Sequence, residues 1–246
     1  DSDWSSDVCS SDLSAPTVAN GMVYVGGSNA AVYALHAVTG EEIWSNKTLE
    51  DSIYFAPHVV GETVYVGSWN ATTNSYKEST LYALNARDGT ERWVYNEPQS
   101  VIQTSPTATE ETVFVSSADK TLYSVDSESG LKNWDFLQPY FINHEVCIVD
   151  GSVYLTDGID LYALDKDDGS QLWSTKLEPA DDIHYRDGIG SPSVVNGTVH
   201  LGTMAFDADT GEEQWRLSDV SESGYNYEFG TPTVAENTVY VPLNKK

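Results

Sequence analysis

The sequence predicts an all-β protein: a β-propeller of four-stranded antiparallel blades, with five complete blades and two strands of a sixth. The main observation is a glycine followed four residues later by a tryptophan, a pair that recurs every 40 to 50 residues or so, as propeller blades do. Short alternating apolar segments fill each repeat, and no stretch has the spacing of a helix. The five pairs are Gly40/Trp44, Gly89/Trp93, Gly130/Trp134, Gly169/Trp173 and Gly211/Trp215.

Each repeat divides into four expected strands. A proline begins the first strand, and an aromatic residue or histidine always follows eight residues later in the second strand, as Pro16 precedes Tyr24. The third strand carries a tyrosine, or Met204 in the fifth repeat, eleven residues before the tryptophan of the fourth strand. The fourth repeat keeps the first spacing but has Val146 in place of the proline. Residues 229–244 supply the two strands of the sixth repeat.

The expected strands are joined by two recurrent turns. Asn20-Gly21, Asp150-Gly151 and Asn196-Gly197 lie between the first and second strands, and these residue types tolerate the positive backbone angles of type I′ hairpins. Pairs such as Thr39-Gly40 and Asp88-Gly89 lie between the third and fourth strands. We therefore expect hairpins at both positions.

The consensus Leu-Tyr-Ala-Leu-Asp-x-x-Thr-Gly-x-x-x-Trp resembles the pyrroloquinoline-quinone-like (PQQ-like) repeat with its tryptophan-docking motif, over residues 15–246. The resemblance implies that the five tryptophans dock between blades and are structural. It also implies a ring of seven or eight blades, of which this chain would be a fragment.

The first residues are expected to have a different origin from the rest of the chain. Residues 3–13 resemble the translation of a common sequencing adapter, so residues 1–14 are expected to be an artefactual or disordered leader and residues 15–246 the propeller. A genuine Ser/Asp-rich leader is the alternative. Under the adapter interpretation the true N-terminus is unread, which leaves open a signal peptide or a membrane anchor.

The charge limits the partners. Thirty-eight acidic against twelve basic residues give a formal charge of −26, which argues against nucleic acid, and no apolar run is long enough to cross a membrane. Without the four aspartates of residues 1–13 the charge is still −22. Acids spread along every repeat resemble the surface of a halophilic, haloarchaeal protein. A surface that binds polycations or calcium is the rival interpretation. Family resemblance implies an extracellular or cell-surface location.

Catalysis is not expected. The resemblance implies, for the quinone-dependent dehydrogenases of the family, a calcium-bound PQQ beneath a ring of two adjacent cysteines. This chain has only Cys9 and Cys147, so no cofactor is assigned, and PQQ with calcium belongs to the alternative of a dehydrogenase fragment that oxidises alcohols or sugars. The run Asp165–Gly169 lacks calcium-loop spacing and reads as a hairpin. His58, His144 and Glu145 lie near innermost strands, where a zinc or general-base role is a secondary hypothesis.

The predicted function is therefore binding or scaffolding, through the face that carries the connections of variable length. The connections between second and third strands, and between blades, differ in length, whereas the two hairpin turns do not; strand alternation places the variable connections together on one face. Aromatic and polar residues there would bind a protein or glycan partner, with Arg186 pairing an anionic or peptide group. Solvated insertions without a ligand are the alternative. The candidate residues are Trp69, Tyr76, His184, Tyr185, Arg186, Asp187, Tyr225 and Tyr227.

Overall fold

The computed structural model describes residues 13–69, 79–140, 144–177, 189–217, 227–235 and 238–245. All regular structure in these ranges is β-strand, as predicted. The chain forms two compact units, residues 1–135 and 136–246, which are described separately. Of the predicted leader, residues 1–12 lie outside the described residues. Leu13 forms a bridge to Gly27, and Ser14 donates its amide to the carbonyl of Gly26 at 2.9 Å.

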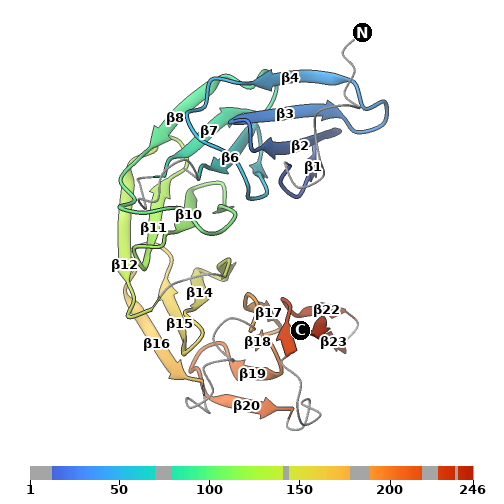
Figure 1. Ribbon diagram of the computed structural model, residues 1–246. Coiled ribbons are helices and arrows are strands. Elements are labelled where there is room, and N and C mark those ends of the chain that lie inside the picture. The colour runs from blue at the N-terminus through green and yellow to red at the C-terminus, as the bar shows by residue number, and fades with distance from the viewer. Residues whose placement is uncertain are drawn as a thin grey trace. The chain divides into compact units, whose positions relative to one another are not determined.

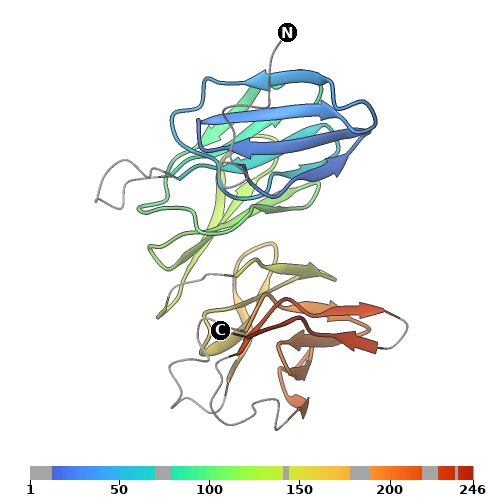
Figure 2. The same ribbon diagram turned by 45° about the vertical axis from the view of Figure 1, so that its right-hand side comes forward.

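The first unit contains three blades, each a sheet of four consecutive strands (Figures 1 and 2). The strands of the first blade are β1 (Thr17–Ala19), β2 (Met22–Gly27), β3 (Ala31–His36) and β4 (Glu42–Asn46). The second blade has β5 (His58–Val60), β6 (Thr63–Gly67), β7 (Leu81–Asn85) and β8 (Glu91–Tyr95). The third has β9 (Thr107–Ala108), β10 (Thr112–Ser116), β11 (Thr121–Asp126) and β12 (Lys132–Leu137), whose end passes into the second unit.

The second unit contains two more four-stranded blades and two shorter sheets. The fourth blade has β13 (Cys147–Val149), β14 (Ser152–Thr156), β15 (Asp160–Asp165) and β16 (Gln171–Lys176). The fifth has β17 (Ser193–Val195), β18 (Thr198–Leu201), β19 (Met204–Asp207) and β20 (Glu213–Arg216). The predicted two strands of a sixth blade are β22 (Thr233–Ala235) and β23 (Thr238–Tyr240), which pair with each other. An unpredicted pair joins β21 (Tyr227–Phe229) to β24 (Leu243–Lys245).

Three tryptophans of the repeat occupy equivalent places in their blades, as the repeat predicts. Trp44 lies opposite Ala34, Trp93 opposite Ala83 and Trp173 opposite Ala163. In each case the register shifts by one residue just after the alanine of the third strand. Such an irregularity adds local twist, so the same bend recurs at the same place in each blade.

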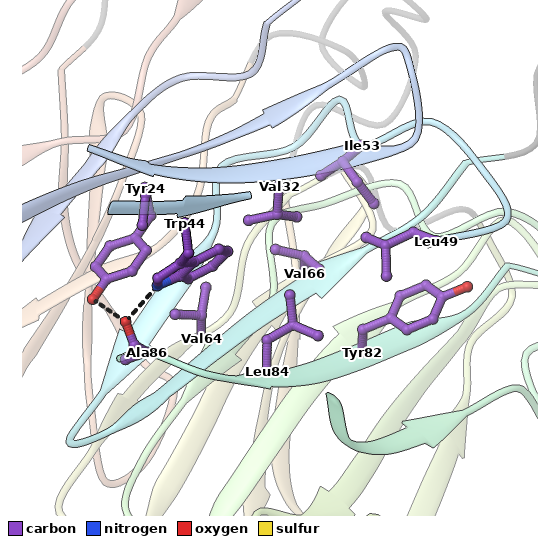
Figure 3. Close-up of a cluster of buried hydrophobic side chains, with 11 residues drawn as sticks. Tyr24, Val32, Trp44, Leu49, Ile53, Val64, Val66, Tyr82, Leu84 and Ala86 are labelled. Carbon is purple, nitrogen blue, oxygen red and sulfur yellow. Dashed lines mark hydrogen bonds between the residues drawn. The ribbon is translucent and has the colours of Figure 1, made fainter. Parts of the chain in front are cut away.

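One part of the core of the first unit lies between its first two blades (Figure 3). Trp44 and Val32 of the first blade pack with Val64, Val66 and Leu84 of the second. The alternation of strand residues places these side chains on facing sheet surfaces, so that neighbouring blades bury one another's apolar faces.

A three-part joint connects adjacent blades, and its tryptophan and glycine come from different repeats. The Trp44 indole N–H donates to the main-chain carbonyl of Ala86 at 2.9 Å, and the Tyr24 hydroxyl donates to the same oxygen at 3.2 Å (Figure 3). Gly89 lies beneath the indole: a Cβ added there would be 2.4 Å from Cε3 of Trp44. Gly89 also has a positive φ of 71°, so glycine is required at this turn for two reasons.

The same joint recurs in both units. Trp93 and Tyr65 both donate to the carbonyl of Ser127, at 3.0 and 3.4 Å, and Trp93 covers Gly130. In the second unit Trp173 and Tyr154 both donate to the carbonyl of Ala208, at 2.9 and 3.3 Å. The constant residues of the repeat therefore hold one blade to the next.

In the part of the chain that the structure describes, one tryptophan and one glycine of the repeat differ from their counterparts, the tryptophan in exposure and the glycine in its contacts. Trp215 is 43% exposed, whereas Trp44 and Trp93 are 7% and 9% exposed. Gly40 has a positive φ close to that of Gly89, but no atom lies within 4 Å of a Cβ added there. These two positions provide natural controls for the joint.

Candidate binding face

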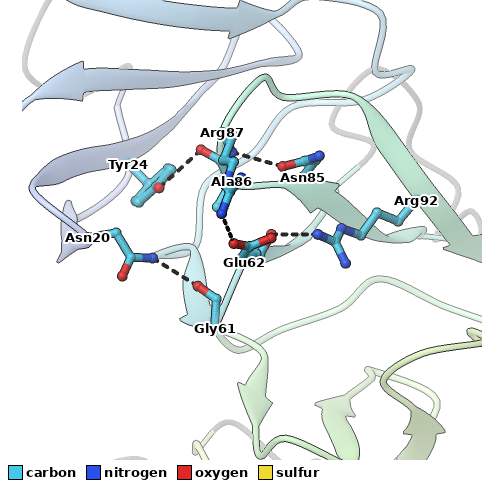
Figure 4. Close-up of polar contacts among 8 residues, drawn as sticks. All are labelled: Asn20, Tyr24, Gly61, Glu62, Asn85, Ala86, Arg87 and Arg92. Atoms are coloured by element: carbon cyan, nitrogen blue, oxygen red, sulfur yellow. Dashed lines mark hydrogen bonds and ion pairs between the residues drawn. The ribbon is translucent and has the colours of Figure 1, made fainter.

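The two constant turns of each blade lie together at one end of the sheet. In the first blade the amide of Ala37 donates to the carbonyl of Gly21 at 2.9 Å, and the equivalent bond recurs in the other four blades. Figure 4 shows this side for the first two blades. Asn20 donates to the carbonyl of Gly61 at 2.8 Å, and Glu62 forms an ion pair with Arg87. These polar groups are therefore occupied within the fold.

The variable connections lie at the opposite end of the strands, as the sequence predicts. Two of them are anchored in the same way, each by an isoleucine on a glycine of the second strand: Ile53 packs on Gly26, and Ile102 packs on Gly67. A Cβ at Gly26 would lie 2.2 Å from Cγ2 of Ile53, so the missing side chain makes room for the isoleucine. Ile53 and Ile102 are fully buried. A connection fixed in this way can present neighbouring side chains in a defined geometry.

Three aromatic side chains gather beside the first anchor. Trp69, which lies just after β6 in the second blade, stacks on Phe55 with ring centroids 6.1 Å apart and an interplanar angle of 6°. Tyr54 meets Trp69 edge to face at 5.6 Å and 77°. Tyr54 is 37% exposed and Trp69 39% exposed. We call Tyr54, Phe55 and Trp69 the aromatic cluster.

The described residues include only part of the predicted site. Trp69 is partly exposed, and Tyr227 lies in β21, where its main chain pairs with Lys245. The remaining candidates fall outside the described residues: Tyr76, His184, Tyr185, Arg186, Asp187 and Tyr225. Sequence reasoning missed Tyr54 and Phe55, although two adjacent aromatics where the next blade has Gln103 and Thr104 were a usable signal.

The tyrosine of the third strand supports the variable connections. Asn29 donates to the Tyr33 hydroxyl at 2.7 Å, and the Tyr123 hydroxyl donates to Asp119 at 2.8 Å. The Tyr162 hydroxyl lies 3.3 Å from Asp157 and 3.4 Å from Asp160. Burial, followed by the neighbouring carboxylates, raises the pKa of Tyr162 well above its ordinary value. The hydroxyl is therefore a neutral donor that holds these connections.

Asp160 gives a pH-dependent prediction. Burial, and then the charge of Asp157, raises its carboxyl pKa. A carboxyl group whose pKa is raised in the folded state stabilises the fold fully at pH values below its ordinary pKa of about 3.9. That stabilisation is lost as the pH rises through the folded-state pKa. Asp160→Asn removes the charge and retains an acceptor for Tyr162. The midpoint temperature should therefore rise at pH 7, and the gain should disappear near pH 3.

Asp126 is the control of opposite sign. The Ser129 hydroxyl, followed by the Ser129 amide, donates to Asp126 and lowers its carboxyl pKa. That stabilisation is present above the ordinary pKa and is lost as the pH falls through the folded-state value. Asp126→Asn should therefore lower the midpoint at pH 7. Calorimetry at both pH values measures the two effects, and a lower midpoint for Asp160→Asn at pH 7 would contradict the assignment.

The acidic turn of the fourth blade uses its carboxylates within the turn. Asp165 accepts from the amides of Asp167 and Asp168, at 2.8 and 3.2 Å, and Asp168 accepts from the amide of Ser170 at 2.8 Å. The Ser170 hydroxyl and amide lower the pKa of Asp168. Asp207 makes the same contacts in the fifth blade. This geometry supports the hairpin interpretation of the run.

His36 and Cys147 take structural positions. His36 accepts through Nδ1 from the amides of Val38 and Thr39, at 3.3 and 3.2 Å, within a constant turn. Cys147 is half-buried in β13, and burial raises the pKa of its thiol. Among the described residues, no three side chains of His, Cys, Asp or Glu are grouped closely enough to hold a metal ion. The described residues also contain no helix long and apolar enough to cross a membrane.

Comparison with known proteins identifies relatives of this fold. The crystal structure of BamB from Moraxella catarrhalis superposes with a TM-score of 0.65 and 19% identity, covering 90% of this chain and 78% of the other. The crystal structure of the computationally designed Ika8 protein gives a TM-score of 0.73 and 16% identity, covering 95% and 71%. Identities at this level establish the fold alone. No curated protein matches the chain by sequence. The model of the family described as outer membrane protein assembly factor BamB matches residues 2–103 and 56–241, and the chain therefore belongs to this family of PQQ-like β-propellers.

Proposed function

We propose that this chain is a non-catalytic binding propeller, exported and adapted to high salt, which binds a protein partner through the face of its variable connections. The observation that carries the proposal is the aromatic cluster, which is partly exposed on an anchored connection. Exposed aromatic rings on a rigid support are typical of protein interfaces, since they give contact area at little entropic cost. The description of the family as an assembly factor also favours a protein over a glycan as partner.

The alternative, a quinone-dependent dehydrogenase, finds little support in the residues. The chain has no adjacent cysteines, and Cys147 packs with apolar residues such as Val194. The described carboxylates at the acidic turns already accept hydrogen bonds from their own main chain. We therefore propose that the chain oxidises neither alcohols nor sugars. A dye-linked oxidation assay with added PQQ and calcium should show no turnover above that of the cofactor alone.

Photocrosslinking tests the binding face. Tyr54 and Val38 are both exposed, but they lie at opposite ends of the strands, on a variable connection and a constant turn. With p-benzoylphenylalanine at one of these positions, irradiation of cells that express the protein should give a discrete adduct to one protein from position 54 and none from position 38. Equal yields, an adduct from position 38 alone, or no adduct from position 54 would contradict the proposal.

Salt dependence tests the proposed adaptation to high salt. Thirty-eight acids against twelve bases leave an excess negative charge of −26 that repels itself in the compact state. Because salt screens this repulsion, the midpoint of thermal unfolding should rise steadily between about 0.1 M and molar salt. Equal midpoints at the two concentrations would remove the argument for a halophilic protein.

A further inference from the structure

The rings of the aromatic cluster are held from both of the segments that supply them. The amide of Trp69 donates to the carbonyl of Ser52 at 2.8 Å, which joins the two segments. The amide of Ile53 donates to the carbonyl of Gly27 at 3.0 Å, and the Ser52 hydroxyl donates to the carbonyl of Ser28 at 2.6 Å. These bonds tie the connection to the first blade. The rings therefore need little further ordering when a ligand binds.

The next blade shows that this scaffold does not require aromatic residues. There the amide of Ala118 donates to the carbonyl of Val101 at 2.8 Å, in the place of the bond from Trp69 to Ser52. Ile102 packs on Gly67 as Ile53 packs on Gly26. The positions of Tyr54, Phe55 and Trp69 are then taken by Gln103, Thr104 and Ala118. The three rings are therefore an addition to a backbone arrangement that is stable without them.

The charge of the connection that supplies Tyr54 and Phe55, and of the whole chain, indicates the chemistry of the ligand. The connection of residues 47–57 contains Glu50 and Asp51, and its one basic side chain, Lys47, lies over the ring of Tyr33 at 5.7 Å. The whole chain has a charge of −26. The faces of tryptophan and tyrosine attract cations, and carboxylates on the connection that supplies Tyr54 and Phe55 favour a cation as well. An uncharged sugar ring would gain the stacking but not the charge attraction.

We propose that the aromatic cluster is a recognition site for an arginine side chain of the partner polypeptide. Arginine is favoured over lysine because its planar guanidinium stacks on aromatic faces and is more weakly hydrated. The inference rests on the proposed function, since it names the chemistry by which that face would recognise a protein.

A peptide of alternating glycine and arginine, ten residues long, is a suitable probe, and the same peptide with citrulline is its neutral isostere. Calorimetric titration at about 0.5 M salt screens the long-range attraction of the acidic surface. The arginine peptide should bind at least tenfold more tightly than the citrulline peptide. Trp69→Ala should weaken arginine-peptide binding about tenfold, and Gln103→Ala on the next blade should leave it unchanged. Midpoints of thermal unfolding well above the temperature of the titration establish that both variants are folded.

Three results would overturn the inference: equal affinities for the two peptides, an arginine affinity that does not depend on Trp69, or Trp69-dependent binding of chitohexaose in place of the arginine peptide. The photocrosslinking experiment separates this failure from that of the proposed function. An adduct from position 54 together with any of these results would retain the protein-binding face but exclude arginine recognition. Absence of the adduct would count against the face itself.

Discussion

Replacing Trp44 by alanine is expected to lower the free energy of unfolding by about 3–5 kcal/mol, the range for truncation of a buried tryptophan. The indole is 7% exposed, donates to the carbonyl of Ala86 at 2.9 Å and covers Gly89. The substitution therefore removes an apolar contact and one of the two hydrogen bonds to that carbonyl. Urea denaturation monitored by circular dichroism measures the loss.

Trp215→Ala is the matched control. Trp215 lies opposite Ala205 as Trp44 lies opposite Ala34, but it is 43% exposed. Its truncation should cost less than about 1.5 kcal/mol, because much of its apolar surface already contacts water. Similar losses for the two variants would show that the cost comes from the blade itself and not from the joint between blades.

The second large effect is expected for Gly89→Ala. At φ of 71° an alanine costs about 1–2 kcal/mol, and its Cβ would lie 2.4 Å from Trp44, which adds an overpacking cost of about 1–3 kcal/mol. The sum is a loss of about 2–5 kcal/mol in the free energy of unfolding, measured by the same denaturation.

Gly40→Ala separates the two contributions to that loss. Gly40 has φ of 73° and no atom within 4 Å of the added methyl group, so only the backbone cost applies. The loss should therefore be about 1–2 kcal/mol. If Gly40→Ala is as destabilising as Gly89→Ala, backbone conformation alone explains the glycine at this turn.

The repeat made the blades predictable, but not the contacts between them. The spacing of Gly89 and Trp93 is a property of one repeat, whereas Gly89 packs against Trp44 of the repeat before it. Fixed spacings reveal that a rigid unit recurs. They do not show which copies of its residues meet, because that depends on how one sheet stacks on the next.

Two other features could not be predicted, because they depend on contacts that the local sequence pattern does not indicate. The link from Asp157 and Asp160 to Tyr162 requires both the turn and the third strand of the blade. The pairing of β21 with β24 is made by main-chain groups that are the same for every residue type, so side-chain alternation could not indicate it.

The candidate site was predicted in part for a similar reason. Trp69 was identified because it begins an unusually long connection. Tyr54 and Phe55 were not predicted, because the connection that contains them has an ordinary length. It spans thirteen residues from Trp44 to Pro57, as does the connection from Trp93 to Pro106. Length variation identifies insertions, but it does not detect a change of side chain on a constant backbone.

A double-mutant cycle on Trp44 and Gly89 tests most directly the claim that the constant residues of the repeat hold neighbouring blades together. If the indole lies on the glycine, adding the methyl group in the Trp44→Ala background should cost only the backbone contribution seen in Gly40→Ala, about 1–2 kcal/mol. The two single losses would then exceed the loss in the double variant by about 1–3 kcal/mol. Additive losses would contradict the joint, because they would mean that the two residues do not meet.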